Sequence, residues 1–360
     1  MIEKAPRKAG KICRYMPWRP NLEKDDKIRL VNDASAKPKG GPSLNDLIHV
    51  GPKLHKNLVG LLISFRLRAI ALTADIEKAF LQMMLDEKDR DSVRILSLKN
   101  FTQPVSPSNI EIYRSTRPPF GVNASPFLLN MVIQDLFSDE PENQWYKIGR
   151  ESFYVDNLLV STTTVVEALQ LYEVLTEKLK SVGFNLREWT SNSVQFRKSI
   201  PAEKLSTKAH VSVSGLSWDV NLDTLSYKFE DKVEAHSLRT TLSCLQQVFD
   251  PLGCILPCLL DLKMFLQECW KLKLSWDQEL PTPFQARLQR LKVERNEILG
   301  ITMPRFLWPQ PMNGAGSLFE LHTFCDASIK AYGCAVYLVS KPKSGCLVRT
   351  YSLRKVGWHP

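Results

Sequence analysis

Apolar residues in the first 220 positions fall mostly into short runs bounded by Gly, Pro, Asn and Ser, which is typical of β-strands joined by loops. The strands predicted from these runs are 27–31, 70–76, 93–98, 110–115 and 210–220. Residues 120–137 are predicted to be a Gly/Ser/Pro loop that leads into a helix, and apolar positions three and four residues apart predict helices over 55–66 and 164–184. The last helix should end at Gly183, since glycine readily forms a carboxyl-terminal cap.

The pattern changes after residue 230, where longer helices replace strands. Residues 237–249 place their apolar side chains on one face, and the Asp-Pro pair at 250–251 should end this helix. The side chains on that face are Leu238, Leu242, Leu245 and Phe249. Two further helices are predicted over 259–273 and 284–298. Residues 318–355 then contain three strand-like segments, the start of a sheet that we expect the chain not to complete.

Two acidic residues stand at the ends of apolar strands. LTADIEKAF (72–80) carries Asp75 where a strand turns into a helix, and SFYVDNLLVS (152–161) carries Asp156 at the tip of a predicted hairpin. Strands that lie side by side would bring these carboxylates together. Paired carboxylates repel and normally need a cation, and two Mg²⁺ ions suit phosphoryl transfer. The alternative is that Asp75 caps a helix and Asp156 shapes a turn.

The composition is that of a globular protein, with 44% hydrophobic and 24% charged residues. A formal charge of +10 points to a polyanionic partner, although a merely basic protein would show the same value. No apolar run approaches the roughly 20 residues that span a bilayer, so we expect no membrane partner. The basic N-terminus lacks the apolar core of a secretory signal, which predicts a reducing cytoplasmic or nuclear location.

Six sequence blocks follow one another in an order that resembles a known family. RLVNDASAK, GGPSLND, LTADIEKAFLQ, PPFGVNASPFLLN, FYVDNLLVS and FDPLGCILP resemble the polymerase region of BEL/Pao retrotransposons, which are LTR elements encoding a reverse transcriptase. The resemblance covers nearly the whole chain. It implies an α+β right-hand polymerase, with fingers and palm over 1–220, a mainly helical thumb and connection over 221–310, and a truncated ribonuclease H-like segment over 311–360.

The resemblance also implies site residues. Asp75, the backbone carbonyl of Ile76 and Asp156 would bind two Mg²⁺ or Mn²⁺ ions, and Phe80 would stack beneath the incoming sugar. Further nucleotide- and template-binding residues would be Arg29, Gly121, Ser125, Pro126 and Tyr154, and the residues that grip the primer would be Gly215, Leu216 and Trp218. Lys24 and Lys27 are possible companions of Arg29. Phe80 and Trp218 could equally be core aromatics, and Arg29 a solvated charge.

Later segments are matched in the same way. Lys263, Lys271 and Lys273 of the thumb-like helices could follow phosphates, or form a solvated helix face. Asp326 in FCDAS matches the first metal-binding residue of ribonuclease H, whose further acids we do not expect within this chain. The resemblance further implies that the chain would have an RNA template, a DNA primer or product and deoxynucleoside triphosphates as its partners. The location would be a cytoplasmic retrotransposon particle or the nucleus.

Asn157 departs from the usual acidic pair. It removes a negative charge, and an Asn carbonyl ligates cations more weakly than a carboxylate. Loss of charge stabilisation could lower the rate roughly 10²–10³-fold. Asn also accepts positive φ, which suits a tight turn. We therefore expect metal binding to survive and RNA-directed DNA polymerase activity to be reduced. The alternative is a catalytically weak or inactive nucleic-acid-binding relic, while an unrelated nucleotidyl-transferring repair enzyme is disfavoured by the thumb-like FDPLGCILP.

Overall fold

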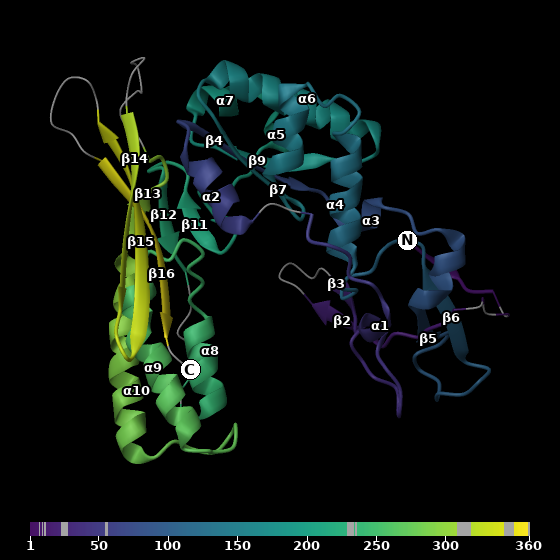
Figure 1. Ribbon diagram of the computed structural model, residues 1–360. Helices are drawn as coiled ribbons and strands as arrows, with labels where there is room; N and C mark the ends of the chain where they lie inside the picture. Colours follow the sequence, from purple (N-terminus) through teal and green to yellow (C-terminus); the bar gives the residue numbers. More distant parts are fainter. Residues whose placement is uncertain are drawn as a thin grey trace. The chain divides into compact units, whose positions relative to one another are not determined.

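The computed structural model describes residues 1–6, 8, 10, 12–22, 28–54, 57–228, 234, 236–307, 318–341 and 349–358. The chain forms two compact units, each built from several segments. The first unit contains 1–56, 74–158 and 170–189, and the second contains 57–73, 159–169 and 190–360. Both combine helices with antiparallel sheets, as Figure 1 shows, which confirms the α+β class.

Two small antiparallel sheets belong to the first unit. One has the strand order β1 (Ile2–Lys4), β6 (Ile110–Ser115) and β5 (Arg94–Leu98), and the other pairs β2 (Trp18–Leu22) with β3 (Ile28–Asn32). The unit's helices are α1 (Leu44–Leu47), α3 (Ala79–Gln82), the 3-10 helix η2 (Glu87–Val93), α4 (Ser125–Leu136) and α5 (Gln144–Ser152). Ser43 caps α1 in a capping box with Asp46.

A four-stranded sheet carries the two acidic residues predicted for the site. Its order is β7 (Phe153–Tyr154), β8 (Asn157–Thr162), β4 (Ile70–Ile76) and β9 (Leu186–Ser191). Helix α6 (Val165–Ser181) follows β8, and Gly183 ends it with a φ of 85°. Most of β4 is buried, in keeping with its continuous apolar sequence. The antiparallel pairing of β7 with β8 confirms the predicted hairpin at 152–161.

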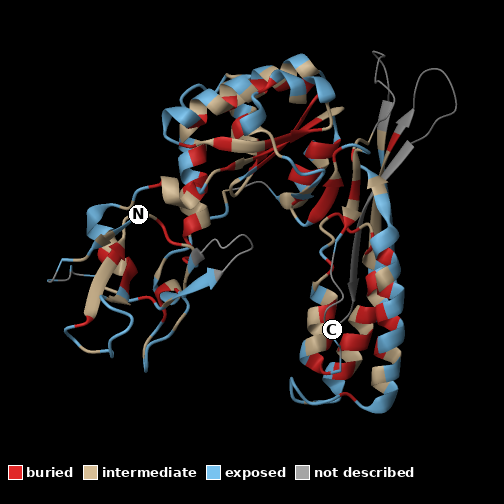
Figure 2. Ribbon diagram, turned by 180° about the vertical axis from the view of Figure 1, so that it is seen from behind, coloured by how far each residue is buried: buried red, intermediate tan, exposed pale blue. Residues whose placement is uncertain are grey.

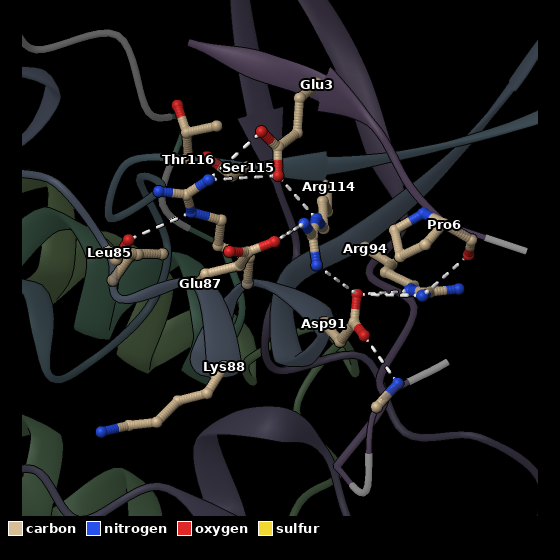
Figure 3. A network of polar contacts seen from close by, with 12 residues as sticks. Glu3, Pro6, Leu85, Glu87, Lys88, Asp91, Arg94, Arg114, Ser115 and Thr116 are labelled. Carbon is tan, nitrogen blue, oxygen red and sulfur yellow. Dashed lines mark hydrogen bonds and ion pairs between the residues drawn. The ribbon is translucent and has the colours of Figure 1, made fainter. Parts of the chain in front are cut away.

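Buried charges hold part of the first unit together (Figure 3). The Asp91 carboxylate accepts hydrogen bonds from Gly10 N at 2.7 Å, Arg94 Nε at 3.0 Å and Arg114 Nη1 at 3.2 Å. Arg114 also pairs with Glu3 at 2.7 Å, which ties β1 to β6. Burial by itself raises the pKa of Asp91, but these hydrogen bonds outweigh it and the net pKa is lowered.

The second unit contains a helical part with an apolar core. Its helices are α8 (Leu238–Gln246), α9 (Leu256–Lys271) and α10 (Thr282–Asn296), and buried residues line the sides on which they meet (Figure 2). The core residues are Leu238, Cys244, Leu262, Phe265, Leu266, Cys269, Leu280, Leu288 and Leu291. The prediction for Phe249 is wrong, because α8 ends at Gln246 and Phe249 is half-exposed beyond it.

Sheets complete the second unit, together with α2 (Leu58–Arg66) and α7 (Val194–Ser199). One sheet is β10 (His210–Val213), β11 (Leu216–Asp219), β12 (Thr224–Tyr227) and β13 (Thr302–Pro304), and the other is β14 (Leu318–Ala327), β15 (Ala331–Lys341) and β16 (Arg349–Trp358). The single strand predicted over 210–220 is wrong. Ser214 and Gly215 have φ values of 47° and 93° and form a tight turn, because two central residues with positive φ fit the twist of a hairpin.

Arg305 makes an extensive set of polar contacts in the second unit. Its guanidinium is fully buried and donates to the carbonyl oxygens of Phe65, Arg68 and Ala69 at 3.0, 2.6 and 2.7 Å. It also pairs with both carboxylate oxygens of Asp223, at 2.8 and 2.7 Å. The segment after α2 is thereby joined to the turn between β11 and β12 and to the end of β13.

None of the helices in the described part of the chain combines the length and the apolar character needed to cross a lipid bilayer.

We predict that Asp91→Asn lowers the free energy of unfolding by about 3 kcal/mol at pH 7, because it leaves buried guanidinium groups without their anion. Urea denaturation of the wild type and of the variant measures this difference in unfolding free energy. Since the folded pKa of Asp91 lies below 3.8, its stabilisation is present above that pH and is lost as the pH falls through the lowered pKa. The difference between wild type and variant should therefore shrink in acid.

Asp89→Asn is the matched control, because Asp89 is exposed on the same 3-10 helix. It should change the unfolding free energy by less than about 0.5 kcal/mol. Equal effects of the two substitutions would contradict the role given to Asp91.

Candidate active site

A backbone hydrogen bond brings the two predicted metal-binding residues onto neighbouring strands. The amide of Ile76 in β4 donates to the carbonyl oxygen of Asp156 at 3.0 Å. On the other side, the amide of Glu77 donates to the carbonyl oxygen of Asn185, just before β9, at 2.9 Å. Asp75 is consequently placed at the end of β4, between the hairpin that carries Asp156 and the start of β9.

The hairpin turn has an unusual backbone. Tyr154 pairs with Asn157, which leaves Val155 and Asp156 as the two loop residues, and Val155 has a φ of 58°. Positive φ at only the first loop position matches a type II′ turn. Asn157 itself pairs with Tyr154 outside the turn, so its tolerance of positive φ is not used here. A β-branched residue rarely adopts this conformation, and such strain concentrates at functional sites.

Asp156 carries a carboxylate that is partly removed from water. Burial raises its pKa above 3.8, opposed by hydrogen bonds from its own amide and from Asn157. The Asn157 amide nitrogen donates to Asp156 Oδ1 at 2.8 Å, while most of Asn157 is exposed. The neutral amide therefore orients the carboxylate but leaves its negative charge uncompensated.

Arg187 is a site residue that the sequence reading missed. It lies in β9, with its Nε 3.9 Å from Asp75 Oδ1 and its Nη1 3.5 Å from Glu77 Oε1. The Nε is buried and has no hydrogen-bond acceptor among the described residues. Glu77 Oε2 also accepts a hydrogen bond from Asn185 at 2.9 Å. A positive charge thus lies beside Asp75. The only indication of Arg187 in the sequence was a cation in a strand after the Gly183 helix cap.

These donors suit a hard divalent cation, which prefers carboxylate and carbonyl oxygens. A desolvated carboxylate without a cationic partner, as at Asp156, is stabilised when such an ion binds. The described residues contain no cluster of three or more His, Cys, Asp or Glu side chains that could hold a metal.

The aromatic and small residues predicted to bind the nucleotide follow strands β4 and β6 in the sequence. Phe80, at the start of α3, meets Phe120 edge to face with ring centroids 5.5 Å apart. Gly121 has a φ of 96°, and a Cβ there would lie 2.3 Å from the carbonyl oxygen of Asn32. No other residue type fits Gly121 without moving the backbone.

The loop after Gly121 leads directly into α4. Ser125 is buried, and its hydroxyl donates to the carbonyl oxygen of Pro119 at 3.2 Å. Pro126 lies in the first turn of α4, where its missing N–H costs no hydrogen bond. Both residues shape the loop by packing and backbone geometry.

Arg29 lies in β3, opposite Asn21 of β2. Lys24 and Lys27 fall outside the described residues. The assignment of Arg29 to the triphosphate therefore stays a prediction that rests on the sequence resemblance.

The residues expected to grip the primer divide into two groups. Gly215 is exposed at the tip of the β10–β11 hairpin, whereas Leu216 and Trp218 are fully buried behind it. Trp218 packs edge to face on Phe65 at 5.3 Å and donates its indole N–H to Asp223 at 2.9 Å. Leu216 and Trp218 can therefore act only by supporting the hairpin.

The remaining predicted cations and acids differ in exposure. Lys263 is partly buried on α9, and this burial lowers its pKa, while Lys271 and Lys273 are exposed. Only the latter two are placed to meet phosphates without further desolvation. Asp326 is exposed near the end of β14 and accepts a hydrogen bond from the amide of Ala327 at 2.9 Å.

Known structures share this fold. The chain is similar to the foamy viral protease–reverse transcriptase with double-stranded DNA, at a TM-score of 0.61 and 16% identity, covering 99% of this chain and 52% of that one. The same viral protein with an RNA/DNA hybrid gives 0.58 and 15%, covering 99% and 40%. A further complex with double-stranded DNA gives 0.58 and 17%, covering 99% and 63%. The chain thus spans about half the length of these proteins, and identities this low concern the fold alone.

Two sequence families match parts of the chain. No curated protein sequence matches the chain. Residues 45–193 match the reverse transcriptase (RNA-dependent DNA polymerase) family, and residues 237–355 match the Pao retrotransposon-like RNaseH-like domain. These two matches occur in this order along one chain, which confirms the resemblance found in the sequence. Residues 45–193 are therefore a reverse transcriptase region and residues 237–355 Pao-type ribonuclease H-like sequence, the combination that the resemblance to BEL/Pao retrotransposons implies.

Proposed function

We propose that the chain is an RNA-directed DNA polymerase that extends a DNA primer on an RNA template with deoxynucleoside triphosphates. The hydrogen bond between Ile76 and Asp156 carries this proposal, because it sets two acid-bearing strand ends side by side. Two bound Mg²⁺ or Mn²⁺ ions would supply activation of the primer 3′-oxygen and neutralisation of the triphosphate. Asp75, Asp156 and the carbonyl of Ile76 would hold them.

The chain's own residues would position the reactants. Phe80 would support the sugar, and the loop at Gly121, Ser125 and Pro126 would shape the pocket, because its backbone is tightly fixed against Asn32. Arg187 would keep the carboxylate of Asp75 oriented while that of Asp156 is held by Asn157.

Further contacts are proposed from the resemblance together with exposure. Arg29 would bind the triphosphate, Tyr154 the template or nucleotide, and the turn at Gly215 the primer end. The exposed Lys271 and Lys273 would contact phosphates, in keeping with the formal charge of +10. Residues 1–220 would be the fingers and palm, 221–310 the thumb and connection, and 311–360 a ribonuclease H-like segment containing Asp326.

Asn157 favours a second candidate, a weak or inactive polymerase that still binds nucleic acid. The amide supplies a hydrogen bond to Asp156 in place of a third negative charge. The site would then hold its metals less tightly than one with three carboxylates. The two candidates share a fold and differ in whether this reduced charge supports turnover.

Primer extension on an RNA template separates the candidates. We predict extension with Mg²⁺ or Mn²⁺, and a loss of at least about 10²-fold in Asp75→Asn, because a ligand of the transition-state charge is removed. The exposed Asp89→Asn should extend as wild type does. Salt-sensitive binding to an RNA–DNA duplex without extension would leave only the non-catalytic candidate.

Metal binding can be followed without turnover. We predict that Asp156→Asn raises the melting temperature in chelator at pH 7 by roughly 2 °C. Because burial raises the folded pKa of Asp156, its charge destabilises the metal-free fold, and stability falls as the pH rises through that pKa. Mg²⁺ should raise the melting temperature of wild type and of Asp89→Asn, but not of Asp156→Asn. Destabilisation by Asp156→Asn in chelator, or an undiminished response to Mg²⁺, would argue against the site.

Restoring the acid tests the role of Asn157. In Asn157→Asp, the hydrogen-bond donor to Asp156 becomes a second carboxylate, so the metal-free protein should melt at a lower temperature than wild type. The rise in melting temperature with Mg²⁺ should be larger, and extension up to roughly 10²–10³-fold faster. A smaller response to Mg²⁺ than in wild type would show that position 157 does not face the metals.

A further inference from the structure

Two thiols face one another across the hairpin of β14 and β15. Cys325 lies directly opposite Cys334 in the strand register, and their Sγ atoms are 3.1 Å apart. Cross-strand neighbours in an antiparallel pair have the Cα separation that a disulfide requires, so a bond between them needs little backbone movement. The register is held by the turn between the strands, where Ser328 N donates to the carbonyl oxygen of Ala331 at 2.8 Å.

Accessibility distinguishes this pair from the core cysteines. Cys325 is exposed and Cys334 is partly exposed, whereas Cys244 and Cys269 are buried in the helical core. The contact with Cys325 raises the pKa of the Cys334 thiol. Thiol–disulfide exchange also depends on access, so the more exposed Cys325 is the first nucleophile of the two.

We propose that Cys325 and Cys334 form a reversible disulfide, a redox modification site in the ribonuclease H-like segment, when the chain meets a low-molecular-weight disulfide such as oxidised glutathione. The Cys325 thiolate attacks one sulfur of oxidised glutathione and releases one reduced glutathione. Cys334 then loses its proton and attacks Cys325 Sγ, which releases the second. The two thiols are oxidised, and one glutathione disulfide is reduced to two thiols.

The crosslink would lie on the face of the hairpin opposite Asp326. Side chains alternate along a strand, so Cys325 points away from the face shared by Phe324 and Asp326. On that second face, Phe324 meets Tyr337 edge to face at 5.7 Å. Oxidation would therefore fix the register of β14 and β15 beside Asp326 without covering its carboxylate. An exposed disulfide of this kind is readily reduced, which makes the modification reversible.

Mass spectrometry of the full chain tests the proposal. All proteins in this experiment carry Cys346→Ser, because Cys346 lies close in sequence and could compete for disulfide formation. Each is treated with oxidised glutathione, and free thiols are blocked with iodoacetamide. Trypsin cleaves after Lys330, between the two cysteines, so the disulfide joins two peptides. We expect this linked pair as the main product on a monomeric chain, and its loss on treatment with reduced glutathione.

Matched variants separate the pair from ordinary thiol reactivity. Cys258→Ser removes an exposed cysteine elsewhere and should leave the linked pair unchanged. Cys325→Ser should abolish the link and leave Cys334 free or joined to glutathione. Glutathione adducts on both cysteines without a link, or a bond between two chains, would overturn the proposal.

Discussion

The hydrogen bond from the Ile76 amide to the Asp156 carbonyl is the constraint on which the candidate site depends. It fixes β4 beside β8, and so places one acidic strand end next to a tight turn that carries another. The two acids have different neighbours. Arg187 offers Asp75 a nearby positive charge, whereas Asn157 gives Asp156 a neutral donor. Burial raises the pKa of Asp156, and the hydrogen bond from Asn157 only partly opposes this effect.

Local sequence was sufficient to locate Asp75 and Asp156, because each follows an apolar run long enough to predict a strand. It could not reveal Arg187, whose significance depends on a strand that becomes a neighbour only after folding. The same limit applies to Asp91 and Arg305, since their partners come from distant segments. The turn at Ser214 and Gly215 was missed, although the apolar positions shift there from 211 and 213 to 216, 218 and 220, which breaks the alternation of a single strand.

The two units bury different kinds of side chain. Around Asp91, the first unit desolvates several charges and satisfies them with one another, an arrangement that depends on geometry and fails when one partner is removed. The helical part of the second unit buries aliphatic and aromatic side chains at helical spacing, which tolerates substitution more readily. Similarity of fold to the foamy viral proteins at 15–17% identity is consistent with both kinds of core being built from many different sequences.

Arg305 holds the segment around the end of α2 largely through its main chain. Three of its acceptors are main-chain carbonyls, at Phe65, Arg68 and Ala69, which every amino acid possesses. Phe65 and Arg66 are also held by their side chains, because Phe65 is buried against Trp218 and Arg66 donates to the carbonyl oxygens of Pro304 and Arg305. Substitution at Arg68 or Ala69 would therefore leave the acceptors of the guanidinium in place, whereas substitution at Phe65 or Arg66 would remove contacts of their own.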